Sequence, residues 1–443
     1  MIRAIINTIE RFFGINNPFK TKNLIFMCFI LSVFILARSL ADVFFYAFAG
    51  VSLIIVMLSN IQYCVPILFY LLPFSSILKP NLDAMSLFTI LFFLVIVKMV
   101  ISTRTIQVSV LIWLGIVFVY NLIFSGFEQI TTILTTVGGL MLVYYSGRAK
   151  LNTNISILSF SLGLCFSSAL AMMKASLPII NSFIRDNITK LGDDSYASRF
   201  SGLQGNPNYF TLDIIIALAA IIVFIYNNNS KPIHNICIVA LSVFGLMSVS
   251  KSFLLAWLLL VAFWFIISLR QGIGNVAKFF FVAIMGAAVI YLFAYDYINS
   301  YFARLAQDSN ATSIDDVTTG RTEIWRAYIK VIFGNLDILV FGKGLKAILK
   351  SAGKGTHNTY LETLFQSGIV GTTVTIASIK ACMGKVSLKG AIWLPVLMLL
   401  IRMLGIGILT YDNLWFYFVI IVILSRDYTA HHEKRLYSGR EVL

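Results

Sequence analysis

Long apolar runs separated by short polar segments make up most of this chain between residues 24 and 424. A helix of roughly 20 residues crosses the hydrocarbon layer of a bilayer, which is about 30 Å thick. The pattern therefore predicts an all-α polytopic membrane protein with about 12–14 transmembrane helices. The runs are centred at Leu24–Ala37, Val43–Leu58, Val65–Leu78, Ala84–Ile101, Val108–Phe124, Ile130–Ser146, Ile155–Met173, Phe210–Tyr226, Ile236–Val249, Phe253–Leu269, Val276–Ala294, Leu361–Ile379, Ile392–Leu409 and Leu414–Leu424.

Composition supports the same class. Of the 443 residues, 59% are hydrophobic and 12% are charged, whereas soluble domains carry about 25% charge. The net charge of +15 would suggest nucleic acid in a soluble protein, but here the basic residues gather in alternate short loops and at both ends. By the positive-inside rule these segments are cytoplasmic, and no nucleic-acid partner is expected. They contain Arg3, Arg11, Lys20, Lys22, Arg104, Arg148, Lys150, Lys231, Arg270, Lys380, Lys385, Lys389, Arg426, Lys434, Arg435 and Arg440.

This topology predicts seven segments, with two long loops on the extracytoplasmic side. They are an amphipathic cytoplasmic segment at 1–22, a transmembrane bundle at 23–173, a first long loop at 174–209, central transmembrane helices at 210–294, a large, partly helical loop at 295–360, C-terminal transmembrane helices at 361–425 and a basic cytoplasmic tail at 426–443. The cytoplasmic loops are short, so a folded nucleotide-binding domain has no place there. Neither a phosphate-binding Gly-x-x-x-x-Gly-Lys loop nor an Asp-x-Asp pair occurs, and the five cysteines are scattered without metal-ligand spacing. We expect chemistry at the extracytoplasmic face, without metal or cofactor.

The large loop contains a predicted amphipathic helix with an arginine in its first turn. Ile324, Tyr328 and Ile332 recur one helical turn apart. Arg321 opens this helix, where the helix dipole disfavours a cation by about 0.3–1 kcal/mol. Such a placement favours a ligand role, because helix N–H groups beside a guanidinium suit phosphate. An ion pair with a nearby aspartate, Asp315 or Asp316, is the alternative.

The same loop ends in the polar sequence Gly355-Thr356-His357-Asn358, directly before an apolar run. An imidazole titrates near neutral pH, so His357 is the first candidate for a catalytic base. The alternative is a histidine that caps the following helix or hydrogen-bonds in the headgroup region.

Further polar candidates lie in the first long loop and beside later runs. Arg199 precedes two amides, Asn206 and Asn208, which can bond sugar hydroxyls or cap a helix. Lys251 lies at the outer surface, where a lysine often only extends its ammonium to water. Asp213 and Arg402 lie within runs, where a charge costs at least about 2.5 kcal/mol and needs a polar partner. For these last two, a buried structural pair and a substrate contact both fit.

These pieces resemble the O-antigen polymerase and ligase superfamily of bacterial inner-membrane enzymes. The matching motifs cover about the second half of the chain. They are Gly202-Leu203-Gln204-Gly205-Asn206-Pro207-Asn208, Ser250-Lys251-Ser252, Gly320-Arg321 with Trp325, Phe341-Gly342-Lys343-Gly344, His357-Asn358-Thr359-Tyr360-Leu361-Glu362 and Gly368-Ile369-Val370-Gly371. One position departs from the family, which usually has arginine where this chain has Lys251. A lysine keeps the charge but loses the bidentate geometry of a guanidinium.

The resemblance implies glycosyl transfer from a polyprenyl-pyrophosphate-linked oligosaccharide to an acceptor of the same kind, at the periplasmic face of the inner membrane. In this scheme His357 is the base, and the substrate-binding residues are Arg199, Arg321, Lys251, Asn206, Asn208 and Asn358, with Glu362, Asp213 and Arg402 as further candidates. Membrane lipid, a chain-length regulator and a flippase of the same pathway are the other implied partners. The resemblance favours a polymerase. A ligase using the same donor and a lipid-linked glycan transporter are the alternatives.

Overall fold

The computed structural model describes residues 20–81, 83–184, 187–190, 196–227, 231–309, 321–350, 353 and 355–438. Each of the fourteen apolar runs contributes to a helix. Seven of the described helices are long and apolar enough to cross a membrane, and five apolar helices are shorter. The prediction of an all-α polytopic membrane protein is confirmed, while the number of spans stays a prediction. The expected amphipathic helix at 1–22 falls almost wholly outside the described residues, as do Asp315 and Asp316.

The chain forms two compact units. Unit 1 comprises Met1–Ser102, Ala149–Thr189 and Tyr196–Ile298, and unit 2 comprises Thr103–Arg148, Lys190–Ser195 and Asn299–Leu443. These units combine segments that are far apart in sequence. The seven-segment division drawn from the sequence therefore describes order along the chain, and it stays a prediction.

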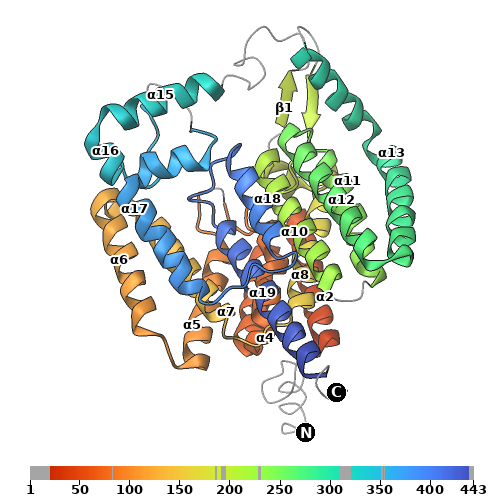
Figure 1. Ribbon diagram of the computed structural model, residues 1–443, viewed down its shortest axis with the longest axis horizontal. Helices are drawn as coiled ribbons and strands as arrows, with labels where there is room; N and C mark the ends of the chain where they lie inside the picture. The colour runs from red at the N-terminus through yellow and green to blue at the C-terminus, as the bar shows by residue number, and fades with distance from the viewer. Residues whose placement is uncertain are drawn as a thin grey trace. The chain divides into compact units, whose positions relative to one another are not determined.

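Unit 1 is a helical bundle with one central helix. Its helices are α2 (Thr21–Leu40), α3 (Phe44–Leu58), α4 (Ile61–Leu71), η1 (Leu72–Phe74), α5 (Leu87–Thr103), α8 (Thr153–Met172), η3 (Lys174–Ser176), α9 (Pro178–Phe183), α10 (Pro207–Asn227), α11 (Pro232–Leu246), α12 (Lys251–Gln271) and the first part of α13 (Ile273–Ser309). Helix α10 is apolar on all sides and packs on α8, α11 and α12 (Figure 1). A helix that is apolar all round belongs in the interior of such a bundle.

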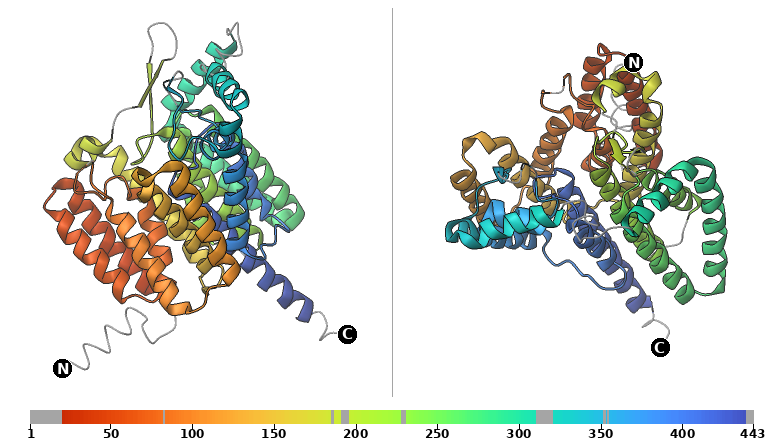
Figure 2. Two further views of the ribbon diagram at one scale, coloured as in Figure 1. Left: turned by 90° about the vertical axis from the view of Figure 1, so that its left-hand side faces the viewer. Right: turned by 90° about the horizontal axis from the view of Figure 1, so that it is seen from above.

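The first long loop of unit 1 is more ordered than the sequence suggests. After η3 and α9 it forms a two-stranded sheet from β1 (Asn187–Lys190) and β2 (Tyr196–Arg199). Figure 2 shows this sheet at one end of the helices of the unit rather than among them. Strand β2 leads into the turn at Gly202–Asn206, so Arg199 is held close to the start of α10.

Unit 2 contains α6 (Val108–Ser125), η2 (Phe127–Gln129), α7 (Ile130–Ser146), α15 (Arg321–Gly334), α16 (Leu336–Phe341), α17 (Thr359–Met383), α18 (Trp393–Met403) and α19 (Asn413–Ser438). Helices α6, α7 and the second part of α17 lie side by side, and α7 also packs on α19. Helix α15 and the first part of α17 run across this group (Figures 1 and 2).

Helix α17 is broken at Gly368, which has a φ of 60° and a ψ of −172°. The break leaves the carbonyls of the preceding turn without donors from the same helix. Backbone amides of the loop after α16 donate to two of these carbonyls. The Lys343 amide donates to Phe365 O and the Gly344 amide to Gln366 O, both at 2.8 Å. From α6, the Tyr120 hydroxyl donates to the third carbonyl, Ser367 O, at 2.7 Å. The span expected over Leu361–Ile379 is therefore two helices, and we call Thr359–Ser367 the α17 arm.

The predicted amphipathic helix of the large loop is α15. Tyr328 and Ile332 are buried, and they form a hydrophobic cluster with Ile338 of α16 and Phe365 of the α17 arm. The rings of Tyr328 and Phe365 meet edge to face at 4.8 Å between centroids. The apolar face of α15 thus packs on the protein.

Two helix ends differ from the sequence-based expectation. Helix α13 continues past Ala294 to Ser309, because no glycine or proline interrupts the sequence there. Helix α18 ends at Met403 rather than running on to Leu409, and Gly405 and Gly407 follow this end directly.

The break in α17 predicts a stability difference between two glycine variants. A Cβ at Gly368 would overlap the Val340 carbonyl, whereas at Gly384, whose φ is similar at 64°, it would meet no described atom within 4 Å. Both Gly368→Ala and Gly384→Ala place alanine at a positive φ, but overpacking affects the first alone. We expect Gly368→Ala to be less stable by a further ~1–3 kcal/mol, measured as a lower thermal unfolding midpoint in detergent. Equal midpoints would contradict the close approach of the two backbones.

Candidate functional site

The site residues predicted from the sequence fall into two groups, one in each unit. In unit 1, Arg199 ends β2 and is half-buried. Its Nε donates to Ser248 O at 3.0 Å, and its Nη2 donates to Asn208 Oδ1 at 3.4 Å. The Ser250 hydroxyl also donates to Asn208 Oδ1, at 3.2 Å. The structure thus brings Arg199 and Asn208 together with the turn that precedes Lys251.

The other candidates of unit 1 have structural contacts. Asn206 Oδ1 accepts from the Asn208 amide at 2.9 Å, which starts α10. Asp213 is fully buried and accepts a hydrogen bond from the Gln204 side chain. Of the two alternatives for Asp213, the structure thus provides a buried structural partner. Lys251 is the first residue of α12 and is partly exposed. Substrate roles for these residues stay predictions.

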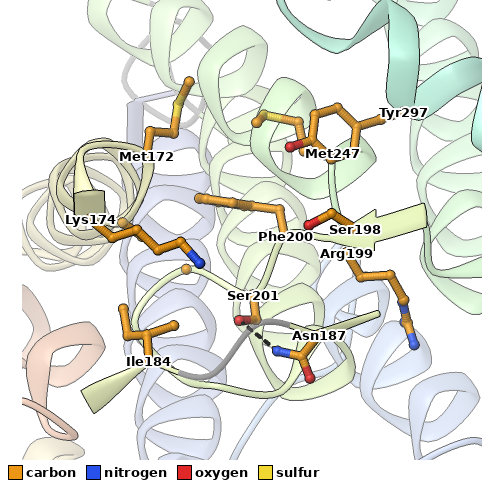
Figure 3. A pocket seen from close by; sticks show the side chains of 12 residues that line it. Met172, Lys174, Ile184, Asn187, Ser198, Arg199, Phe200, Ser201, Met247 and Tyr297 are labelled. Carbon is orange, nitrogen blue, oxygen red and sulfur yellow. Dashed lines mark hydrogen bonds between the residues drawn. The ribbon is translucent and has the colours of Figure 1, made fainter. Parts of the chain in front are cut away.

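A cavity of about 220 Å³ in unit 1 contains a cation that sequence reasoning missed. Lys174, at the start of η3, lines it together with Asn187, Arg199 and Ser201. Figure 3 shows the Lys174 side chain reaching toward Phe200 and Ser201, while Arg199 extends away from it. The sequence signal was available, since Lys174 is the first charged residue after the apolar run ending at Met173.

In unit 2, His357 is exposed on a loop with a φ of 49°. The residues on either side are buried and fixed. Trp325 Nε1 donates to Thr356 O at 2.9 Å, and the Thr356 hydroxyl donates to Asn358 O at 2.8 Å. Asn358 Oδ1 caps α17 by accepting from the amides of Tyr360 and Leu361. The capping side chain is therefore that of Asn358, and His357 projects from a held backbone.

Arg321 is the first described residue of α15, as the sequence predicts. Its Nη1 donates to Gly405 O at 3.2 Å, and no described carboxylate lies within 4.0 Å of it. Burial lowers the pKa of Arg321, and the positive charge of Arg304 lowers it further. Two neighbouring cations of this kind attract an anion with more than one charge. Arg304 was missed, because it lies in the extension of α13 that the sequence did not predict.

The segment between α18 and α19, residues 404–412, contacts the site and was also missed. It accepts a hydrogen bond from Arg321 at Gly405, while Thr359 Oγ1 donates to Ile406 O at 2.6 Å and accepts from the Ile408 amide at 3.2 Å.

Arg402 is 1% exposed in the last turn of α18. The expectation that Arg402 lies in the middle of a span is corrected, because α18 ends one residue later and a cation is favoured at a helix C-terminus.

A second cavity, of about 270 Å³, lies in unit 2 beside the α17 arm. Glu362 and Gln366 line it from one face of the arm, four residues apart. Gln366 Nε2 donates to Glu362 Oε1 at 3.3 Å. Burial raises the pKa of Glu362 to about 7, against the opposing effects of the Gln366 side chain and of the Leu409 amide. The arm precedes the break at Gly368, so this carboxyl lies outside the apolar helix that follows.

Among the described residues no group of three or more His, Cys, Asp or Glu side chains could hold a metal ion. A family model described as O-antigen ligase matches residues 236–376. This match supports the O-antigen polymerase and ligase superfamily. The resemblance drawn from the sequence motifs is thereby confirmed. Members of this family are enzymes that act on lipid-linked glycans. No significant match was found among curated proteins or among solved structures.

The superfamily match includes the loop and the helices that carry the unit 2 candidates. Arg304, Arg321, His357, Asn358 and Glu362 lie within it, and so does Lys251 of unit 1. The remaining candidates lie outside the matched range, namely Arg199, Asn206, Asn208, Asp213 and Arg402.

The hydrogen bond from the Trp325 indole to Thr356 O should slow local opening of the His357 loop. Trp325→Phe keeps most of the ring but removes the donor to Thr356 O, an interaction worth about 0.5–1.5 kcal/mol. We expect hydrogen exchange at residues 355–358 to become faster. Trp257→Phe is the matched control, because it removes an indole hydrogen bond of 2.9 Å to Ser242 Oγ in unit 1. An unchanged exchange rate in Trp325→Phe would show that other contacts fix the loop.

Proposed function

We propose that the protein is a glycosyltransferase that polymerises polyprenyl-pyrophosphate-linked oligosaccharide repeat units into a surface polysaccharide. In this proposal the reaction takes place at the outer face of the inner membrane, with both chain termini in the cytoplasm and without metal or nucleotide. The superfamily match and the membrane architecture support the general class. The positive-inside pattern of the loops supports the sidedness.

The observation that carries the proposal is the position of Arg321 one helical turn before Trp325, whose indole donates to Thr356 O in the His357 loop. The Arg321 side chain is partly buried, is within the electrostatic influence of Arg304 and has no described carboxylate within 4.0 Å. A pyrophosphate leaving group develops charge as its bond to the sugar breaks, and nearby cations stabilise that charge most strongly where water is excluded. The Trp325 contact ties the backbone of the His357 loop to the helix that begins with Arg321.

The proposed reaction is a single displacement. A hydroxyl oxygen of the acceptor sugar attacks the anomeric carbon of the donor, and the bond from that carbon to the pyrophosphate oxygen breaks. The hydroxyl proton passes to the His357 imidazole, and the lipid pyrophosphate leaves with the electron pair of the broken bond. The product is a longer glycan on the acceptor lipid. Inversion at the anomeric carbon is the expected stereochemistry.

A ligase is the second candidate, because the matching family model bears that description. Both reactions use the same donor and differ in the acceptor, which for a ligase is lipid A-core or a protein. Surface polysaccharide from a deletion strain distinguishes them. A lost polymerase leaves acceptors that carry a single repeat unit. A lost ligase leaves long polymer attached to the carrier lipid, together with lipid A-core that carries no polymer. A transporter would change the sidedness of intact lipid-linked glycan without new glycosidic bonds.

His357 gives the sharpest test of the chemistry. Glutamine can hydrogen-bond but cannot take up a proton near pH 7, so we expect both His357→Ala and His357→Gln to lower kcat about 10²- to 10⁴-fold. The measurement is reconstituted polymerisation of purified lipid-linked repeat units, with donor binding measured separately as the folding control. Near-normal turnover of His357→Gln would remove the histidine from the role of base.

Arg321 tests the binding of the leaving group. Arg321→Ala removes a charge-assisted contact, so we expect kcat/KM to fall about 10- to 150-fold. Arg321→Lys should restore part of this loss, since it keeps the charge but not the planar fork. Lys330→Ala, an exposed cation on the same helix, is the control. Full activity of Arg321→Ala at a normal protein level would reassign Arg321 to its backbone contact with Gly405.

A further inference from the structure

The cavity beside the α17 arm contains two buried oxygens that need a hydrogen-bond donor. Glu362 Oε2 and Gln366 Oε1 are buried, and neither meets the distance and angle of a hydrogen bond with any described residue, although the Leu409 amide is close enough to Glu362 to lower its pKa. Gln366 is 4% exposed, and its amide nitrogen is already directed to Ala347 O and Glu362 Oε1. Both free positions are acceptors, and leaving a buried acceptor unsatisfied costs about 1–3 kcal/mol or more. A ligand that completes this site must donate hydrogen bonds to two side chains whose head groups contact each other.

Aromatic and apolar side chains also line the cavity, beside the polar residues Lys346, Thr356 and Thr410. Tyr328 and Phe365 line one part of it, and Ala347 and Ile348 line another. The Tyr328 hydroxyl accepts from the Leu349 amide at 2.9 Å, which fixes the ring in place. An apolar wall facing a pair of acceptors suits a ring with apolar C–H faces and a hydroxyl edge. A sugar has this shape.

Size and charge narrow the ligand further. The volume of about 270 Å³ is slightly below the roughly 300–1,000 Å³ of pockets that hold drug-sized ligands, so one sugar ring fits better than an oligosaccharide. A pyrophosphate would be repelled by the Glu362 carboxylate, and a cationic group would meet the exposed Lys346 at the same cavity. Neutral hydroxyls satisfy both constraints.

We propose that this cavity binds one neutral sugar residue of the acceptor glycan, through neighbouring hydroxyls that donate to Glu362 and Gln366. The assignment rests on the proposed function and gives that function an acceptor subsite. Thr356 lines the cavity, so the ring is bound beside the residue that precedes the proposed base. In the proposed function the donor pyrophosphate is instead bound at Arg321, which contacts residues 404–412 at Gly405, whereas the cavity is lined by Thr410 of that segment.

The test uses the full-length protein in nanodiscs with two substrates that play separate roles. The donor is the purified lipid-linked repeat unit. The acceptor probe is the repeat-unit oligosaccharide released from the polysaccharide of the same strain, which has no pyrophosphate and cannot act as donor. We expect Glu362→Gln to raise the KM for the acceptor probe about 10- to 150-fold, with kcat and the KM for the donor nearly unchanged. Glu362→Asp keeps the carboxylate but moves it back by one methylene group. This variant should give an intermediate KM for the acceptor probe.

A control and a pH series separate binding from a structural effect. Glu128→Gln neutralises an exposed carboxylate of the same unit and should change neither KM. At pH 5 the Glu362 carboxyl is mostly protonated, because burial raises its pKa to about 7, so the ratio of the two acceptor KM values should fall toward one. Tyr328, Lys346 and His357 are present in both proteins, and their titration cancels in this ratio.

Calorimetric titration of the acceptor probe into the protein keeps the two proposals distinguishable. Binding by the wild type that Glu362→Gln weakens supports the subsite, even if the protein proves to transfer glycan to a different acceptor and the polymerase proposal fails. An unchanged KM and binding constant in Glu362→Gln would overturn the subsite while leaving polymerisation intact. A rise in the donor KM alone, or no binding of the probe by the wild type, would overturn it as well.

Discussion

The hydrogen bonds that close the break in α17 determine the geometry of the whole unit 2 site. A backbone carbonyl in apolar surroundings must find a donor, so a helix can break there only where other groups take over the freed carbonyls. Here the donors are the amides of Lys343 and Gly344 and the hydroxyl of Tyr120, on three consecutive carbonyls. Because these contacts turn the α17 arm across the neighbouring helices, Phe365 reaches the Tyr328 cluster, and Glu362 and Gln366 face a cavity.

The same principle holds residues 404–412 in place. This segment is not helical, yet Thr359 bonds it at two positions and Arg321 at a third. A guanidinium that donates to a backbone carbonyl keeps its full charge, since the carbonyl carries none. Among the described residues, Arg321 is therefore positioned by a neutral group rather than by a carboxylate. An ion pair would have positioned it equally well, but at the expense of its attraction for a phosphate.

The sequence predicted the local features of this protein better than its contacts. Apolar runs identified the helices because length and hydropathy are properties of each segment, and the spacing of Ile324, Tyr328 and Ile332 identified α15. It also placed Arg321 at a helix start. The cavity at Glu362 could not be predicted, because it joins segments far apart in the chain, and the effect of Arg304 on Arg321 was missed because the extension of α13 was not expected. The break at Gly368 was missed for another reason: glycine is frequent in membrane helices that continue through it.

The motif glycines acquire a different meaning once the α17 arm is described. A Cβ on Gly342 would overlap the backbone of Gln366 and Ser367, and a Cβ on Gly368 would overlap the backbone of Val340 and Gly342. The arm is thus attached through main-chain atoms, which every sequence variant retains. Phe365 of the arm adds an apolar contact with Tyr328, whereas Glu362 and Gln366 line the cavity. Substitutions at Glu362 and Gln366 can therefore change the lining of the cavity while the main-chain attachment of the arm stays the same.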